Sequence, residues 1–345
     1  MRHLKLSGTA RERGLTHGKA WPKEIHEFAA IRKSLIKEAM PLWSEHKLKQ
    51  LLDAHIEFLK KDKELWEEFA GIAEGAAISL RDLMILNNHT DLRDFAEGDF
   101  DERLLECSCF AYKKGTKTIA GQTWDMHASA QPYVAHLSIE KENFTQEVFT
   151  LTGCLGLAGV SNKSFAVFIN NLRSREVNVG YAWPAFVRML LNCQDIAQAQ
   201  SLVKEKLPSS GRNFLLVEKE HAINLEVTGK RFETVGNLKQ GTLFHTNHYV
   251  GSLKETEEEG TRSKTTVNRY NCLEKISPEV ISASNFNLEA VADKILIQNP
   301  GVLSIPPSPT EAHASASCGG LIYDFESQEG ISFAGLYAEN DHLKI

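Results

Sequence analysis

The residue with the greatest chemical potential in this sequence is Cys107, in the segment Leu-Glu-Cys-Ser-Cys-Phe that ends at Phe110. A thiolate attacks carbonyl carbons, so a cysteine where an acidic loop gives way to a strand is a candidate nucleophile. Most lone cysteines are instead buried and inert, which keeps simple packing open as an alternative. The text that follows, including Gly121–Asp125 (Gly-Gln-Thr-Trp-Asp), favours the nucleophile.

A second thiol, Cys109, lies two residues from Cys107 and shares its face if the segment is extended. A metal site made by these two cysteines and a nearby histidine is disfavoured, because Cys-x-Cys lacks a second pair of ligands at suitable spacing. His127 and His136 are also expected on separate surfaces. We therefore expect no metal and no cofactor, and packing is the simplest role for Cys109.

The composition is that of an ordinary globular protein. The chain has 345 residues, of which 42% are hydrophobic and 24% charged, and its net charge is −6. This charge argues against a phosphate-binding surface, so we expect no nucleic-acid partner. Neither a signal sequence nor the roughly 20 apolar residues of a membrane span is found. We expect a cytoplasmic protein with free thiols and no membrane partner.

Helices are predicted for the first part of the chain, from about residue 21 to about residue 92. Apolar residues recur there at every third or fourth position, with lysine and glutamate between them. Four helices are expected: Pro22 to Pro41, Leu48–Leu59, Glu64–Ala77, and one that begins at a cap formed by Ser79.

Beyond Cys107 the apolar residues alternate with polar ones, which is typical of β-strands. Two helical stretches, Pro184–Lys206 and Leu288–Gln298, interrupt the strands, and the charged run Lys254–Lys264 is expected to be a solvated loop. The pair Gly319-Gly320 predicts a bulge at a strand start or a close backbone contact. The layout predicts an α+β protein with helices packed on antiparallel sheets. Strands are expected at Thr118–Asp125, Val134–Ile139, Glu147–Leu151, Ser164–Asn171, Arg212–Glu218, Ala222–Thr228, Thr242–Val250, Gly319–Phe325 and Gly330–Leu336.

The stretch from Cys107 to Asp125 resembles the acyl-coenzyme A:6-aminopenicillanic acid acyltransferase family, which is related to the choloylglycine hydrolases within the N-terminal-nucleophile (Ntn) hydrolases. That family shows a Cys-Thr/Ser start followed, at this spacing, by a Gly-Gln-x-Trp-Asp block. Further similar segments occur in the family's order along nearly the whole chain. They are Gly8–Gly18, Glu68–Gly75, Leu86–Asn88, Ser161–Leu172 and Phe244–Tyr249.

The resemblance implies a four-layer αββα sandwich, the Ntn-hydrolase fold, and a precursor that cuts itself between Glu106 and Cys107. A helical fragment 1–106 and a strand-rich fragment 107–345 would then stay together as one folded unit. The freed α-amino group, with a pKa of about 7.7–8.0, would act as the general base for the thiol beside it. Relatives often carry glycine before the nucleophile, so the bulkier Glu106 implies slower or absent self-cleavage.

The same resemblance implies roles for four further residues. Asp125 would hold and orient the amino group, and Asn247 would direct an amide N–H at the oxyanion of the tetrahedral intermediate. Asn171 would complete the oxyanion hole or line the pocket, and Arg269 would bind a substrate carboxylate or Asp125. Structural roles, as a capping aspartate, turn asparagines or a solvated helix arginine, stay open for all four.

The implied function is that of a self-processing cysteine amidohydrolase or acyltransferase, which acts on a small amide through a thioester on Cys107. Hydrolysis is the default because water needs no acceptor site, and acyl-coenzyme A is a further candidate partner. The sequence leaves the acyl group, the amine and self-association open. Two other functions stay open: a papain-like amidase that pairs Cys107 with His248, His245 or His127 without self-cleavage, and a non-catalytic protein of the same fold that binds a small ligand.

Overall fold

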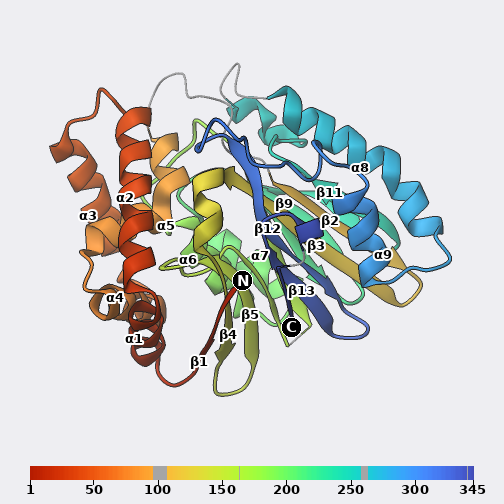
Figure 1. Cartoon of the computed structure of the whole chain (residues 1–345), viewed down its shortest axis with the longest axis horizontal. Helices are drawn as coiled ribbons and strands as arrows, with labels where there is room; N and C mark the ends of the chain where they lie inside the picture. Colours follow the sequence, from red (N-terminus) through yellow and green to blue (C-terminus); the bar gives the residue numbers. More distant parts are fainter. Residues whose placement is uncertain (96–106, 163, 258–262, 340) are drawn as a thin grey trace.

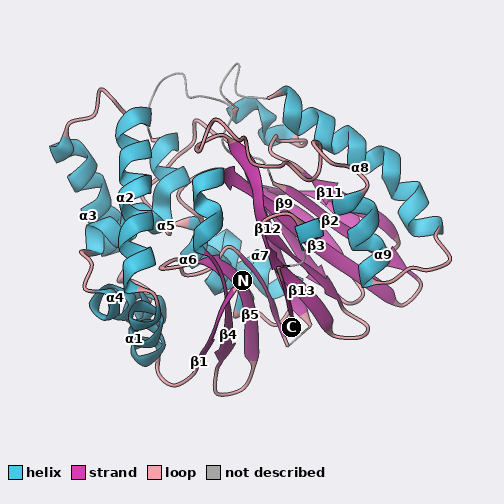
Figure 2. Ribbon diagram, viewed as in Figure 1, coloured by secondary structure: helices cyan, strands magenta, loops and turns pink. Residues whose placement is uncertain are grey.

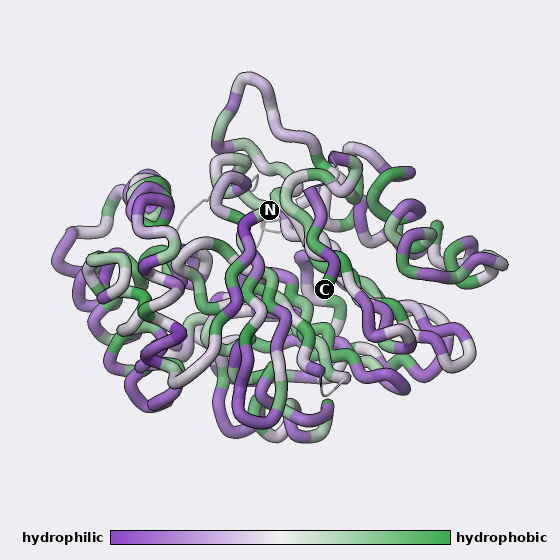
Figure 3. Tube along the Cα trace, turned by 60° about the horizontal axis from the view of Figure 1, so that its bottom comes forward, coloured by the Kyte–Doolittle hydropathy of each residue, from purple (hydrophilic) through white to green (hydrophobic). Residues whose placement is uncertain are grey.

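Two β-sheets lie face to face in the centre of the molecule, with helices on both outer faces and a group of helices at one end (Figure 1, Figure 2). The structure is a computed structural model that describes residues 1–95, 107–162, 164–257, 263–339 and 341–345. Apolar side chains along the inner strands form the core, and the outer loops are mostly hydrophilic (Figure 3).

The first sheet contains, among the described residues, eight strands in the order β1-β4-β5-β6-β7-β8-β9-β10. Its neighbours are antiparallel except for β1 and β4, which run parallel. The strand β8 has the predicted bounds, and β5, β7 and β9 differ from the prediction by one or two residues. The strands are β1 (Arg2–Leu6), β4 (Val134–Glu140), β5 (Thr145–Leu151), β6 (Ala158–Ser161), β7 (Phe165–Asn171), β8 (Arg212–Glu218), β9 (Ala222–Val227) and β10 (Phe232–Leu238).

The second sheet is antiparallel, with the order β11-β2-β3-β12-β13-β14. The register between β12 and β3 shifts between Ser317 and Gly319, which confirms a bulge, although it lies inside the strand and not at its start. A Cβ on Gly320 would lie 2.3 Å from the carbonyl oxygen of Gln122, so this position needs glycine. The strands are β2 (Ser108–Lys114), β3 (Lys117–His127), β11 (Gly241–His245), β12 (Ser315–Asp324), β13 (Glu329–Ala334) and β14 (His342–Lys344).

Helices cover both outer faces of the two sheets. On the first sheet, α6 (Trp183–Leu191) contacts β6 and β7, and α7 (Ile196–Glu205) contacts β8. On the second sheet, α8 (Lys264–Ser282) and α9 (Leu288–Ala292) share a separate apolar core with β2, β12 and β13. The order helix, sheet, sheet, helix confirms the expected αββα sandwich.

Two predictions for this part of the chain differ from the structure in part. The stretch Pro184–Lys206 is two helices, because Asp195 caps a new helix by accepting a hydrogen bond from the backbone N–H of Gln198 at 2.7 Å. The charged run Lys254–Lys264 includes the end of a short 3₁₀ turn at Ser252–Thr256 and the first residue of α8, and residues 258–262 lie outside the described part. Charge density alone did not distinguish a solvated loop from a capped helix start.

Five helices of the described part of the chain form the N-terminal group at one end of the sandwich (Figure 1). Four of them were predicted, and the cap of α5 at Ser79 is confirmed by its hydrogen bond from the N–H of Asp82. The sequence analysis missed α1, whose apolar stripe is weak. A Cβ on Gly14 of this helix would lie 2.1 Å from the carbonyl oxygen of Glu68, so glycines bring α1 and α4 together. The helices are α1 (Ala10–Ala20), α2 (Pro22–Ala39), α3 (Glu45–Leu59), α4 (Lys63–Ala76) and α5 (Leu80–Asp94).

A buried ion cluster, which we call the Glu68 cluster, joins α1 and α4 to α6. It consists of Glu68, Arg13 and Arg188. The Arg188 guanidinium donates to both carboxylate oxygens of Glu68, at 2.6 and 3.1 Å, and Arg13 Nε donates to one of them at 3.3 Å. Burial raises the pKa of Glu68, but the charges of Arg188 and Arg13 outweigh burial and hold this pKa below its usual range. The cluster therefore holds a carboxylate with two cations around it.

Among the helices that the structure describes, none combines the length and the apolar character that crossing a membrane requires.

Candidate active site

Cys107 lies at the start of β2, almost completely buried, with its backbone held on both sides. Its N–H donates to Oδ1 of Asn247 at 2.7 Å. Its carbonyl oxygen accepts from Nη1 of Arg269 at 2.6 Å and from Nδ2 of Asn170 at 2.9 Å. These three partners come from the end of β11, from α8 and from β7, so the nucleophile candidate sits where both sheets and an outer helix meet.

Asn247 follows β11 and is fixed by four hydrogen bonds. Its backbone N–H donates to Oγ1 of Thr266 at 2.7 Å, and its Nδ2 donates to the carbonyl oxygen of Asn171 at 2.9 Å. Its Oδ1 accepts from the N–H of Cys107 and from Nη2 of Arg269 at 3.0 Å. These partners assign the orientation of the Asn247 amide. The carbonyl oxygen of Asn171 can only accept and so faces the NH₂ group, whereas the N–H groups of Cys107 and Arg269 donate and so face the oxygen. Asn247 thus turns its oxygen towards the Cys107 nitrogen.

Arg269 is a buried residue of α8 and belongs to the site. Besides its bonds to Cys107 and Asn247, its Nη1 lies 3.2 Å from Oγ of Ser108. It is placed there because Thr266 and Arg269, three positions apart, share the face of α8 that contacts β2 and β11. A solvated helix arginine, the alternative to a role in the site, is therefore excluded by its burial.

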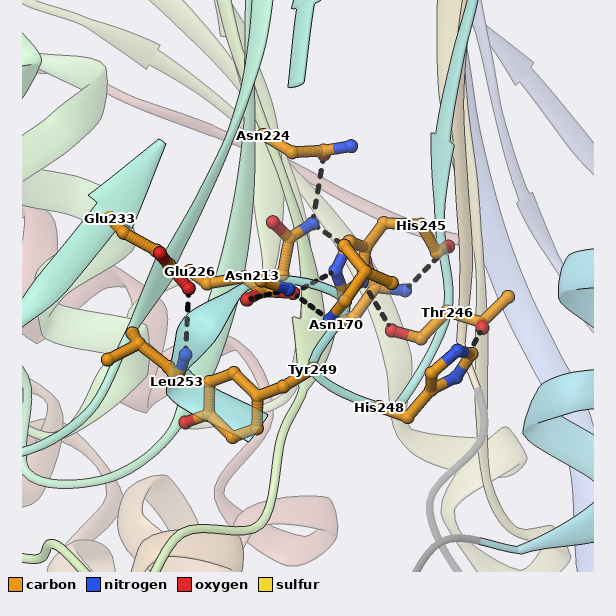
Figure 4. A network of polar contacts seen from close by, with 12 residues as sticks. Asn170, Asn213, Asn224, Glu226, Glu233, His245, Thr246, His248, Tyr249 and Leu253 are labelled. Atoms are coloured by element: carbon orange, nitrogen blue, oxygen red, sulfur yellow. Dashed lines mark hydrogen bonds and ion pairs between the residues drawn. The ribbon is translucent and has the colours of Figure 1, made fainter. Parts of the chain in front are cut away.

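Two neighbouring asparagines at the end of β7 point to different places, as adjacent strand residues do. Asn171 contributes its carbonyl oxygen to Asn247, and its side-chain oxygen is buried without a hydrogen-bond partner among the described residues. Asn170 reaches across to the second sheet, where its Nδ2 contacts the carbonyls of Cys107 and His245 (Figure 4). The sequence analysis chose Asn171 and missed Asn170, although both stand in the quoted segment Ser161–Leu172.

Asp125 is fully buried on β3 and lies close to the Cys107 thiol. Burial raises the pKa of the Cys107 thiol to about 12, and the negative charge of Asp125 adds to this effect. At neutral pH only about one thiol in 10⁵ with such a pKa would be ionised. This thiol therefore needs a neighbouring base before it can attack a carbonyl carbon.

The three histidines considered for a papain-like pair have other partners. His245 places Nε2 2.8 Å from Oε1 of Glu226 and Nδ1 2.6 Å from the carbonyl of Thr246 (Figure 4). His248 places Nδ1 3.0 Å from Oγ1 of Thr266. His127 lies at the other end of β3, with Nδ1 2.7 Å from Oγ of Ser129. Both nitrogens of His245 thus lie against oxygen atoms of Glu226 and Thr246 and not against the Cys107 thiol.

Two residues of the quoted motifs join the sheets and do no evident chemistry. The Cys109 thiol donates to the carbonyl of Ile169 at 3.0 Å, and Oε1 of Gln122 accepts from the N–H of Ile169 at 2.7 Å. Both therefore pin β7 of the first sheet to β2 and β3 of the second. Across the residues that the structure describes, no group of three or more histidine, cysteine or acidic side chains could hold a metal ion. Glu106 lies outside the described residues.

Comparison with known proteins defines the class: the chain is an enzyme of the acyltransferase type. Residues 112–294 match the family model of acyl-coenzyme A:6-aminopenicillanic acid acyl-transferase, and the chain belongs to this family. Its resemblance to this family, inferred from the motifs, is thereby confirmed. The chain is 26% identical over 257 residues to the 40 kDa form of acyl-coenzyme A:6-aminopenicillanic-acid-acyltransferase of Emericella nidulans, a match that covers 72% of this chain and 69% of the relative.

Two solved structures are similar to the chain at low identity. Penicillin V acylase from Agrobacterium tumefaciens has a TM-score of 0.42 at 9% identity, covering 66% of this chain and 82% of the acylase. A mutant of conjugated bile acid hydrolase from Clostridium perfringens has a TM-score of 0.48 at 10% identity, covering 69% of this chain and 92% of the hydrolase.

Proposed function

We propose that this enzyme is a self-processing cysteine amidohydrolase whose nucleophile is Cys107. The observation that carries the proposal is the position of the Cys107 nitrogen, which is held by Oδ1 of Asn247 at 2.7 Å beside a buried thiol. An acceptor at this place suits a peptide N–H before cleavage and an amine N–H after it. The same contact therefore serves both states of a residue that becomes a new N-terminus.

Self-cleavage would proceed by an N-to-S acyl shift. The Cys107 sulfur attacks the carbonyl carbon of Glu106, the bond from that carbon to the Cys107 nitrogen breaks, and the nitrogen takes the thiol proton. Water then hydrolyses the thioester, which leaves a carboxylate on Glu106 and regenerates the thiol. The three bonds to the Cys107 backbone, from Asn247, Arg269 and Asn170, support this step because they fix the Cα from which the thiol must reach back.

In the cut enzyme the new amino group would act as the base that takes the thiol proton. Cys107 requires such a base because the pKa of its thiol is raised. Asp125 would orient this amine. Asn247 carries a second N–H on Nδ2, besides the one that Asn171 accepts, and this second N–H would stabilise the oxyanion. A donor of this kind accounts for roughly 10²–10³ in rate.

The remaining two residues would position the reacting groups. Nη1 and Nη2 of Arg269 donate to Cys107, Ser108 and Asn247, so we propose that Arg269 positions the nucleophile and Asn247 and does not bind a substrate carboxylate. Asn171 offers a buried side-chain oxygen that would accept the N–H of a substrate amide.

The substrate would be a small amide, cleaved through a thioester on Cys107. The related enzyme of E. nidulans is named for an acyl-coenzyme A and an aminopenicillanic acid, which supports a small acyl-bearing substrate and keeps acyl-coenzyme A as a candidate partner. Hydrolysis is the simpler outcome, since water needs no acceptor site.

The intact mass of the purified protein tests self-cleavage. We expect the wild-type chain to separate into fragments 1–106 and 107–345, with Cys107 as the new N-terminal residue, and the Cys107→Ala chain to stay whole. The matched control is Cys272→Ala, which removes the one cysteine that is not buried and should cut like the wild type. A wild-type chain that stays whole and active would contradict the proposal and favour a Cys-His pair.

Labelling with iodoacetamide separates the enzyme from a binding protein of the same fold. It is best done in the Cys272→Ala chain, because only Cys272 among the six cysteines is partly exposed without cleavage. We expect one label, on Cys107, to remove the amidase activity in step with its incorporation. An unreactive Cys107 in the cut protein would contradict the catalytic role.

A further inference from the structure

Arg32 of α2 is a buried cation that forms an ion pair with none of the acidic side chains in the described residues. Its Nη1 donates to the carbonyl of Leu86 and lies 3.9 Å from the sulfur of Cys154, and its Cζ lies 4.4 Å from the centre of the Phe28 ring. Its relative exposure is 2%, and its Nε has no hydrogen-bond partner in the described part of the chain. None of the ion pairs between described residues involves it. A buried guanidinium in this state is destabilising unless an anion joins it.

His89 lies beside this cation on α5, directly after a break in the helix at Asn88, whose φ is −112° and ψ 15°. It is buried to 2% exposure, and neither of its ring nitrogens has a hydrogen-bond partner among the residues described. Burial lowers the pKa of His89 well below its usual value, and the charges of Arg32 and Arg93 lower it further. The ring is therefore neutral, with one N–H to donate.

His127 at the end of β3 completes the group. Its ring centre lies 5.9 Å from that of His89. Its Nδ1 contacts Ser129, while its Nε2 is buried without a partner among the described residues. We call Arg32, His89 and His127 the Arg32 cluster. Three elements, α2, α5 and β3, thus bring together three buried side chains, each with a nitrogen that has no hydrogen-bond partner among the described residues.

The Arg32 cluster is a short distance from the nucleophile. Asp125 and His127 stand two positions apart on β3, so their side chains share one face of the strand and lie about 7 Å apart along it. Cys318, on the neighbouring strand β12, lies beside this stretch of β3, with its sulfur 3.7 Å from the carbonyl oxygens of Met126 and His127. A chain of about five atoms would span the gap.

We propose that the Arg32 cluster is a substrate subsite that binds a carboxylate, carried by the amide on an arm on one side of its scissile bond. This inference rests on the proposed function of Cys107. A carboxylate would accept hydrogen bonds from Nε of Arg32 and from an N–H of His89 and of His127, and it would neutralise the buried guanidinium. Neutral arms of the same length would leave the cation and these donors unsatisfied, so the subsite would select against them.

Binding of four small product-like molecules tests the subsite without requiring turnover. Adipate and hexanoate mimic acids released from an amide with and without a distal carboxylate on its acyl side. The pair 6-aminohexanoate and hexylamine makes the same comparison on the amine side. By calorimetry we expect a difference in one of the two pairs: the member with a distal carboxylate, adipate or 6-aminohexanoate, should bind wild-type protein at least about tenfold more tightly than its partner. The pair that shows the difference tells which side of the amide carries the carboxylate.

Two variants locate this preference and one controls for it. Arg32→Met should remove the preference, and His89→Leu should reduce it at least about threefold, while the exposed Arg81→Met should retain it in full. If Arg32→Met fails to fold, His89→Leu decides. A wild type that does not distinguish the members of either pair, or a preference that survives both variants, would overturn the proposal.

The same calorimetry on Cys107→Ser keeps the two proposals distinguishable. A retained preference in a wild type that never cuts itself would refute self-processing and leave the anion subsite standing. A wild type that cuts itself and is labelled at Cys107, but shows no preference, would refute the subsite alone.

Discussion

The Glu68 cluster and the Arg32 cluster are both buried where the N-terminal helices meet the strand-rich part of the chain, but their charges are balanced differently. Glu68 lies between two guanidinium groups, all within hydrogen-bonding distance. Arg32 has a carbonyl, a thiol and an aromatic ring around it, and no carboxylate in the described structure pairs with it. A buried charge with its partner in the chain serves the fold, whereas one without a partner is suited to a ligand.

A histidine beside each cluster shows the same difference. His17 lies next to the Glu68 cluster, and its Nε2 accepts the N–H of Gly153 at 2.9 Å. His89 lies next to Arg32, with neither nitrogen bonded to another described residue. Both rings are held neutral by burial, but only that of His17 is used to join α1 to the loop after β5. The Glu68 cluster and its histidine therefore hold the two segments together.

The largest effect is expected for Glu68→Gln, which keeps the shape of the side chain and removes its charge. Arg188 would then be buried without its counter-charge, while Arg13 would keep only its ion pair with Glu64 at 2.7 Å. Breaking a buried pair in this way typically costs about 3–5 kcal/mol. The free energy of unfolding, measured with urea, checks this. The control is Glu74→Gln on the same helix, whose pair with Arg11 is half exposed and should matter by less than about 1 kcal/mol. Equal losses for the two variants would contradict a structural role for the cluster.

The next effect is a loss of stability in mild acid that depends on His17. Burial lowers the pKa of His17 to about 4. The negative charge of Glu68 raises this pKa in part, and the positive charge of Arg188 lowers it further. An unfolded histidine takes a proton near pH 6.5, so between pH 6.5 and 4 the unfolded chain binds more protons than the folded one. This contribution is fully present above about pH 6.5 and is lost as the pH falls to 4, up to about 3 kcal/mol.

Urea unfolding at pH 7, 5.5 and 4.5 measures this contribution. His17→Gln keeps an acceptor for the N–H of Gly153 and does not titrate, so its stability should fall less with acid than that of the wild type. Parallel curves for both chains would show that His17 is not the group responsible.

The sequence predicted those parts of the molecule whose signal is local. The helices α2 to α5 show apolar periodicity and caps, and β8 and β7 show uninterrupted apolar runs, so their bounds were close to those observed. The helix α1 was missed because it packs through Gly14 and Gly18, and a close approach of two backbones leaves no apolar stripe in the sequence. Short strands at the sheet edges, such as β1 and β14, carry too few residues for a periodic signal.

The residues of the candidate site were predicted from motifs, but the contacts between those motifs could not be predicted from the sequence. Cys107, Asn247 and Arg269 were named, and the structure brings them together through hydrogen bonds that join residues far apart in the chain. Asn170 was missed, since only the pleat decides which of the two neighbouring asparagines reaches Cys107. The Arg32 cluster had no sequence signal, because it depends on what is missing around a buried cation.

The smallest effect on stability is expected for Arg32→Met, and this makes it the sharpest test of the comparison. Methionine fills a similar volume against Phe28 and removes a buried guanidinium that no described carboxylate balances, so its loss of one hydrogen bond to Leu86 is offset by relief of desolvation. We expect the free energy of unfolding of the ligand-free protein to change by less than about 1 kcal/mol, or to rise. The same substitution at Arg188 should destabilise by several times as much, because it leaves Glu68 buried beside the more distant Arg13 alone. Comparable losses of unfolding free energy at both positions would mean that Arg32 stabilises the fold. They would contradict the distinction between a buried charge that is paired within the protein and one that is not.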